Sequence, residues 1–351
     1  MKTTNIGQLM HLLADTGQPL AVSQLYHLSD LAGERLAQFR QTWAKIPVER
    51  RRQILGFLIE ITESNLEVDF TTAFGACLND DDGEVRALCV EGLWESESPE
   101  LFERLLDMAQ HDPFETARAA AVTALGRFVL LAELGHLSAQ SRQAAEETLL
   151  ALYHSASQGI EVRRRAVEAL AASERPELPG IIESAYYDPD RRMRVSSIFA
   201  MGRSLDPQWE PLLLDELRSH DAECRYEAAR ACGEIALESA IPRLALLLQE
   251  EDREVQEASI WALGQIGGQQ ARQILEEFLD SLDLLEETLR EAVEDALSDL
   301  ALAAGVMQFP LYDYPVDSEL PTASWGEDWI SGVLGNDDIS YPDETDDQEE
   351  P

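Results

Sequence analysis

The sequence predicts an all-α fold, an α-solenoid made of stacked helical hairpins, followed by a disordered acidic C-terminal tail. One observation is a sequence unit that recurs with a period near 31 residues. A second is helical apolar spacing in every segment between the recurring stretches. The third is an excess of acidic residues that is concentrated at the C-terminal end. In a solenoid each unit packs only on its neighbours, so the fold grows by repetition.

The composition narrows the classes of partner. The chain has 351 residues, of which 45% are hydrophobic, and a formal net charge of -40. Such a charge repels phosphate backbones and anionic lipids, so we expect no nucleic acid and no membrane partner. No segment approaches the ~20 apolar residues of a membrane span, and the N-terminus lacks the apolar core of a signal peptide. We therefore expect a soluble, cytoplasmic protein.

Residues 1–78 are predicted to form an N-terminal helical cap. Two helices are expected at residues 29–46 and 48–61, separated by Pro47, and a third at residues 67–78. A solenoid exposes an apolar face at each end, so its terminal units must cover that face. These helices are expected to do so for the array that follows.

Residues 79–303 are predicted to form about seven repeat units. Aligned on one position, called the anchor here, the units carry Arg86, Arg118, Arg163, Arg194, Arg225, Gln256 and Arg290. Six residues after each anchor stands a small residue: Gly92, Ala124, Ala169, Ala200, Ala231, Ala262 and Ala296. Seven residues after it stands Leu, Met or Cys. At 100° per residue these positions share one face of a helix, which is expected to be buried, and small residues there let helices approach closely.

Aspartate is expected to begin several of these helices. Four units have it four residues before the anchor, where an N-cap hydrogen bond is predicted: Asp82, Asp190, Asp221 and Asp252. Two pairs, Asp112-Pro113 and Asp188-Pro189, are predicted to act as a cap followed by a first-turn proline.

A second helix is expected to complete each hairpin. Helical apolar spacing occurs in residues 99–110, 141–154, 178–187, 209–219, 240–250 and 271–282. The step of 45 residues from Arg118 to Arg163 is longer than the others. We expect its extra residues, around 130–141, to form an enlarged turn.

The repeat resembles a known family. "EVRALCVEGLW", "DRRMRVSSIFAMG", "ECRYEAARACG" and "DREVQEASIWALGQIGG" are similar to HEAT repeats of the phycobilisome-lyase type. In that family the Val-Arg helices line the concave side of a superhelix, and the usual function is binding. The resemblance implies a non-enzymatic protein-protein interaction scaffold. The alternative that it implies is a lyase or chaperone for bilins or other tetrapyrroles.

The anchor arginines are predicted to form a structural ladder. Each projects from the first turn of its helix into the seam between units, where carboxylates and carbonyls can receive it. A charge in that place is tolerable only if it is paired. The ladder consists of Arg86, Arg118, Arg163, Arg194, Arg225 and Arg290.

Catalytic and metal-binding patterns are not found. The six histidines are scattered over different units, and none has a partner at helical spacing, as a metal site requires. The iron-dependent hydroxylases built from HEAT repeats carry His-Glu pairs, so this sequence departs from them. The four cysteines match no metal or redox motif and are expected to be buried thiols. We expect no cofactor and no enzymatic activity.

The partner-binding surface is predicted on the face opposite the buried one. Five residues after the anchor, units four to six carry Phe199, Arg230 and Trp261. The same face carries four further arginines, which we expect to form an island of positive charge: Arg164, Arg165, Arg192 and Arg203. Such a surface suits an acidic, aromatic protein or peptide. The alternative is that Phe199 and Trp261 tuck sideways against adjacent helices as extra core.

Residues 304–351 are predicted to be a largely disordered tail. No basic residue follows Arg290, and residues 301–351 contain 13 acidic ones. The stretch "YDYPVDSELPTASWGEDW" interleaves aromatic and acidic residues. It either stays solvated or docks on the groove of its own chain or on a partner.

Overall fold

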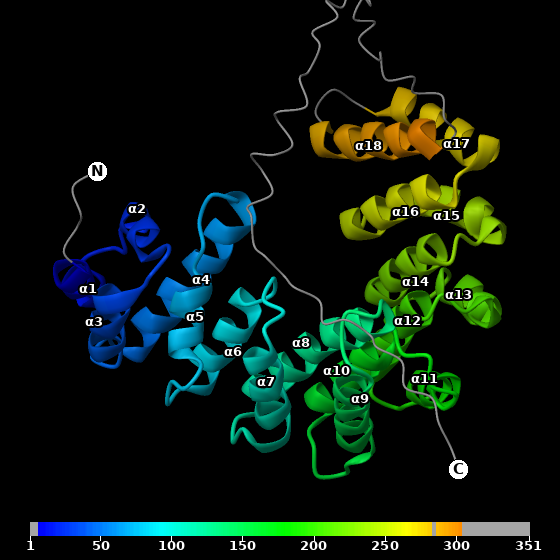
Figure 1. The fold of residues 1–351 in the computed structure, drawn as a ribbon. Helices are drawn as coiled ribbons and strands as arrows, with labels where there is room; N and C mark the ends of the chain where they lie inside the picture. The colour runs from blue at the N-terminus through cyan, green and yellow to red at the C-terminus, as the bar shows by residue number, and fades with distance from the viewer. Residues whose placement is uncertain (1–5, 283–285, 304–351) are drawn as a thin grey trace, which may run out of the picture. The chain divides into compact units, whose positions relative to one another are not determined.

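Two rows of helices alternate along the chain in the computed structural model, which describes residues 6–282 and 286–303 (Figure 1). One row, called the inner row here, consists of α6 (Gly83–Gly92), α8 (Glu115–Glu133), α10 (Ile160–Leu170), α12 (Arg191–Arg203), α14 (Ala222–Glu234), α16 (Arg253–Ile266) and α18 (Glu287–Ala303). The other, the outer row, consists of α5 (Thr71–Cys77), α7 (Pro99–His111), α9 (Ala139–His154), α11 (Leu178–Tyr186), α13 (Glu210–Glu216), α15 (Ile241–Leu247) and α17 (Gly268–Ser281). The prediction of an all-α solenoid is confirmed.

The N-terminal helices precede the two rows. They are α1 (Ile6–Ala14), α2 (Val22–Leu25), α3 (Gly33–Trp43) and α4 (Val48–Ser64), with a 3₁₀ turn at Tyr26–Leu28. Helix α4 packs on α6 as each inner helix packs on the next. The chain divides into two units, Met1–Ala304 and Gly305–Pro351, and the predicted tail lies outside the described residues. The limits predicted for the cap and the array stay predictions.

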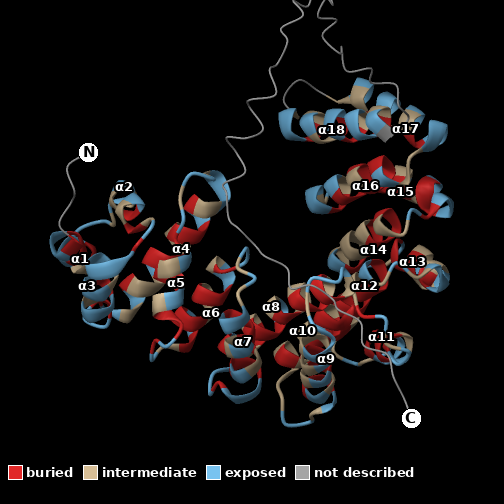
Figure 2. Ribbon diagram, in the orientation of Figure 1, coloured by how far each residue is buried: buried red, intermediate tan, exposed pale blue. Residues whose placement is uncertain are grey.

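Packing is closer along the inner row than along the outer one. Each inner helix contacts the next inner helix extensively, whereas neighbouring outer helices touch at few places. Buried residues accordingly lie between the rows and along the inner seams (Figure 2). All four cysteines are free thiols within this core.

Glycine lets the inner helices approach. Eight residues after the anchor, four units have a glycine that faces the small residue six positions after the next anchor. A Cβ on these glycines would lie only 2.7 to 3.3 Å from the Cα of that alanine, in the pairs Gly126 and Ala169, Gly202 and Ala231, Gly233 and Ala262, and Gly264 and Ala296. A larger side chain would force the helix backbones apart.

Some of the predicted helix N-caps are confirmed and others are wrong. Four aspartates accept a backbone hydrogen bond at the start of an inner helix, as predicted: Asp82, Asp190, Asp221 and Asp252. The two Asp-Pro predictions are wrong. Helix α8 begins only at Glu115, and Asp112 accepts from the N–H of Phe114 in a turn before it. Asp188 likewise accepts from the N–H of Asp190, so it shapes the turn and leaves the cap to the next aspartate.

The predicted enlarged turn is also wrong. The extra residues lengthen two helices, since α8 has 19 residues and α9 has 16. Leu131 and Ala132 are good helix formers and are buried, so burial and propensity both favour continuing the helix. Only residues 134–138 connect the two helices.

Candidate partner-binding surface

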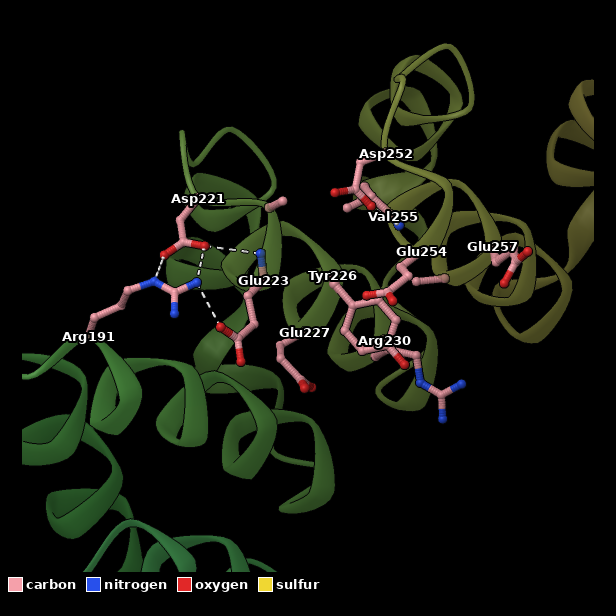
Figure 3. A pocket seen from close by; sticks show the side chains of 12 residues that line it. Arg191, Asp221, Glu223, Tyr226, Glu227, Arg230, Asp252, Glu254, Val255 and Glu257 are labelled. Atoms are coloured by element: carbon pink, nitrogen blue, oxygen red, sulfur yellow. Dashed lines mark hydrogen bonds and ion pairs between the residues drawn. The ribbon is translucent and has the colours of Figure 1, made fainter. Parts of the chain in front are cut away.

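A hollow of about 790 Å³ lies over α12, α14 and α16 on the inner row (Figure 3). We call it the central hollow. Its wall has six carboxylates, Asp221, Glu223, Glu227, Asp252, Glu254 and Glu257, and two guanidinium groups, Arg191 and Arg230. Arg191 is bound by Asp221 and by Glu223, the latter at 2.7 Å. The hollow is therefore acidic.

Arg230 and Trp261 meet across the seam between α14 and α16. The guanidinium carbon of Arg230 lies 3.8 Å from the centroid of the indole. Arg230 makes no ion pair or hydrogen bond with any residue that the structure describes. The edge of the indole packs on Gly233, where a Cβ would lie 2.6 Å from Trp261 Cζ3. Trp261 thus tucks sideways on α14, and its half-buried ring also supports an unpaired cation.

Phe199 lies apart from this pair. It is half-buried and lines a hollow of about 270 Å³ over α8, α10 and α12, together with Arg203. It does not line the central hollow. The structure therefore brings together two of the three residues predicted to form a single row of contacts.

The four arginines of the expected positive island all have carboxylate partners. Arg164 pairs with Glu161 at 2.5 Å and with Glu168 at 3.2 Å, and Arg165 pairs with Glu168 at 2.6 Å. The other two pairs are Arg192 with Asp190 at 3.0 Å and Arg203 with Glu234 at 3.7 Å. The four arginines therefore form no island of net positive charge, because an acidic residue of the same helix, its cap or the next helix pairs with each of them.

The anchor arginines donate hydrogen bonds to groups of their own hairpin and to groups of the next unit. Five of the six donate to a backbone carbonyl of their own hairpin: Arg86 to Asp80, Arg118 to Asp112, Arg163 to Tyr153, Arg225 to Ser219 and Arg290 to Leu282. Four also donate to a side chain of the next unit: Arg86 to Asp112, Arg118 to Gln158, Arg194 to Glu216 and Arg225 to Glu250. Each such bond ties two hairpins together.

The ladder is longer than the sequence indicated. Gln256 donates through Nε2 to the carbonyl of Leu248 at 2.9 Å, so the amide replaces the guanidinium. Arg51 of α4 binds Asp80 in the next hairpin, as Arg86 binds Asp112. Its spacing from Arg86, 35 residues, was a usable signal. Phe57, six residues after Arg51, is not small and concealed the match.

One carboxyl group beside the central hollow is poorly solvated. The pKa of Glu227 is raised to about 7, mainly by burial and then by the negative charge of nearby Glu168, against the opposing effect of Arg230. Burial also raises the pKa of Glu234. Neither an ion pair nor a hydrogen bond joins Glu227 to another described residue. Its environment would therefore favour a cation brought by a partner.

Paired helices stacked in one direction and joined by a ladder of side chains define a helical-repeat solenoid. The family of HEAT repeats matches residues 71–139, 178–252 and 210–298, which together are more than half of the chain. The chain therefore belongs to the HEAT-repeat family, as its sequence motifs predicted.

Several solved structures are similar to the chain. Human deoxyhypusine hydroxylase is 21% identical, over 85% of this chain and 96% of that one, with a TM-score of 0.36. The complex of CpcE and CpcF of phycocyanin lyase from Nostoc sp. PCC7120 is 15% identical, over 82% and 97% of the two chains, with a TM-score of 0.49. Kap95p, in a complex with RanGDP, is 17% identical, over 84% and 41%, with a TM-score of 0.39. At these identities the likeness concerns the fold.

No curated protein sequence matches the chain significantly. Among the described residues, no group of three or more His, Cys, Asp or Glu side chains is arranged to hold a metal ion. None of the helices that the structure describes combines the length and apolar character needed to cross a membrane.

Proposed function

We propose that this chain is a non-enzymatic scaffold that binds a protein or peptide segment along its inner row. The observation that carries the proposal is the Arg230–Trp261 pair beside the central hollow. It combines an unpaired guanidinium and a half-buried indole at a place that can admit a partner side chain. Arginine and tryptophan are the residue types that most often carry binding energy at interfaces.

The proposal assigns different roles to the residues singled out in the sequence. Arg230 and Trp261 are the central contacts, and Phe199 is a separate contact further along the row. Arg164, Arg165, Arg192 and Arg203 keep their carboxylate partners, of which only that of Arg203, Glu234, lies on the next helix. Docking of the tail on this surface stays a prediction, since residues 304–351 lie outside the described part of the chain.

The test compares two matched double variants as baits for proteins of a native lysate. Arg230→Glu with Trp261→Ser changes the inner row. Arg218→Glu with Leu246→Ser makes a comparable change at exposed residues at the end of α13 and on α15. Circular dichroism and thermal unfolding check the fold of each. We expect the inner-row variant to lose partners that wild type and the outer-row variant retain.

Two results would contradict the proposal. Equal retention of partners by both folded variants would place binding elsewhere. A new visible absorption band after mixing the protein with a bilin and an acceptor apoprotein would contradict the absence of enzymatic activity and favour the lyase alternative.

A further inference from the structure

A second hollow lies further upstream on the inner row, over α6, α8 and α10. We call it the upstream hollow. Its volume is about 740 Å³, and its floor is made of small and aliphatic side chains, among them Ala87 and Leu88 of α6 and Ala120 and Ala124 of α8. The repeat pattern does not predict this hollow, because these residues follow the same pattern as those of the other seams.

Trp94 distinguishes this seam from the glycine seams. It stands eight residues after Arg86, at the position where four other units have the glycine that faces alanine of the next unit. An indole cannot fit into that contact. Trp94 is instead 52% exposed and lines the hollow. A large exposed ring beside an apolar floor is a surface suited to an apolar anchor of a partner.

The lip of the hollow carries unpaired negative charge. Glu84 and Glu91 of α6 line it, are exposed, and make no ion pair or hydrogen bond with any described residue. They are seven residues apart, so they lie on one side of α6, about 10 Å from each other along the axis.

The cations at the hollow are engaged already. Arg165 pairs with Glu168 at 2.6 Å. Arg127 donates to the carbonyl of Ser96 at 2.5 Å, in the loop that follows α6. A carbonyl is neutral, so Arg127 keeps its charge, but the two unpaired carboxylates of Glu84 and Glu91 outnumber it.

We propose that the upstream hollow binds an amphipathic helical segment of another protein, with apolar side chains on the floor and lysine or arginine residues facing Glu84 and Glu91. The inference rests on the proposed scaffold function and specifies the partner chemistry. Basic residues seven apart on the partner helix match the spacing of the two carboxylates. The net charge of -40 attracts such a segment at long range.

Two other occupants of the upstream hollow would be repelled by the negative charge of Glu84 and Glu91. The acidic tail of this chain, with no basic residue after Arg290, would place carboxylates against Glu84 and Glu91. A second copy joined by two-fold symmetry would bring the same acidic lip against itself.

The test measures binding of two fluorescent 18-residue peptides to the full chain by anisotropy. One is an amphipathic helix of Leu, Trp and Lys, with lysines seven residues apart. The other is the peptide of residues 312–329, which represents the tail. The first variant is Glu84→Gln with Glu91→Gln. Its control is Glu100→Gln with Glu103→Gln, which changes the net charge equally at exposed positions of the outer helix α7. Any non-specific attraction of the cationic peptide to the acidic tail is the same in both variants, so it does not contribute to the difference between them.

We expect the cationic peptide to bind, and the inner variant to weaken it about fivefold, since each exposed ion pair contributes modestly. The outer control should change affinity less than about twofold. Trp94→Gly should weaken binding on the order of tenfold, because the apolar wall is lost. Reduced binding must occur with an unchanged circular dichroism spectrum.

Three results would overturn the inference. One is no binding of the cationic peptide at about 100 µM, a concentration at which even weak helix-in-groove contacts are populated. Another is equal weakening by the inner and outer glutamine pairs. The third is binding of the 312–329 peptide that Trp94→Gly removes, since the tail would then be the occupant. If the cationic peptide does not bind while the Arg230 and Trp261 variant loses its lysate partners, the scaffold function stands while this inference fails.

Discussion

Replacing Arg86 with methionine is expected to destabilise the seam between α6 and α8 strongly. The Arg86 and Asp112 side chains are 7% and 4% exposed and are joined by two hydrogen bonds, of 2.7 and 2.5 Å. In the variant, Asp112 keeps its bond from the N–H of Phe114 but loses its counter-ion. Breaking a buried pair in this way costs about 3 to 5 kcal/mol, because one charge stays buried and uncompensated.

The matched control is Arg118→Met, at the same position of the next unit. Arg118 donates to two neutral groups, the side chain of Gln158 and the carbonyl of Asp112. No charge is stranded there, so the expected cost is about 1 kcal/mol. The double variant Arg86→Met with Asp112→Asn should recover more than half of the loss, since the buried charge is gone.

Hydrogen exchange is the suitable assay, because a repeat array can open locally without unfolding as a whole. Protection of the α6 to α8 amides should fall in Arg86→Met and fall much less in Arg118→Met. Burial raises the pKa of the Asp112 carboxyl, but the hydrogen bonds from Arg86 and from the N–H of Phe114, together with the positive charges of Arg86 and Arg104, outweigh it, so the net pKa is lowered. The pair thus stabilises the fold above the unfolded pKa of about 3.9 and loses this contribution as the pH falls further. The deficit of Arg86→Met should therefore shrink below about pH 4. Equal protection in Arg86→Met and wild type at pH 7 would refute the reasoning.

Two further predictions concern the α14–α16 region. Gly233→Ala should lower the midpoint of thermal unfolding, since its Cβ would lie 2.9 Å from the Cα of Ala262. Its control is Gly75→Ala in α5, where no atom lies within 4 Å of the new methyl group. This control should raise the midpoint, because the higher helix propensity of alanine adds about 1 kcal/mol to the free energy of unfolding. Equal shifts in both would contradict the close packing. Glu227→Gln should unfold at a higher temperature than wild type at pH 8 and at the same temperature at pH 4. Its raised pKa of about 7 makes the native state bind the proton more tightly, so wild type loses stability as the pH rises to 7 and above. A pH-independent difference in melting temperature would contradict the origin of that shift.

Repetition made the fold predictable, and the same repetition hid its exceptions. The anchor, the small residue six positions after it and the aspartate cap recur in several units, so the pattern can be recognised even where one unit departs from it. Arg51 escaped because Phe57 breaks the small-residue position. The residues after Leu130 were assigned to a turn because they exceed the period, although their helix propensity and burial continue α8.

The candidate surface was less predictable, since it depends on which side chains meet. Arg192 and Arg203 are exposed, as a partner-binding surface requires. Their pairing with Asp190 and Glu234 depends on rotamers and on the spacing of adjacent helices, which a helical wheel does not contain. The stacking of Arg230 on Trp261 depends on the same 31-residue register and was the simplest case, because both side chains occupy the same position of consecutive units.

One repeat position distinguishes the seam between α6 and α8 from four other seams of the inner row. Where it is glycine, the alanine of the next helix packs almost against the helix backbone. Where it is Trp94, the indole stands out at the surface and the alanine of the next unit, Ala124, lines a hollow. The volume that close packing would have filled becomes available to a partner, and the cost to the core falls on one seam among several. The unit that departs from the pattern at this position therefore adds a hollow lined by an exposed indole to the one that lies over the regular units α12, α14 and α16.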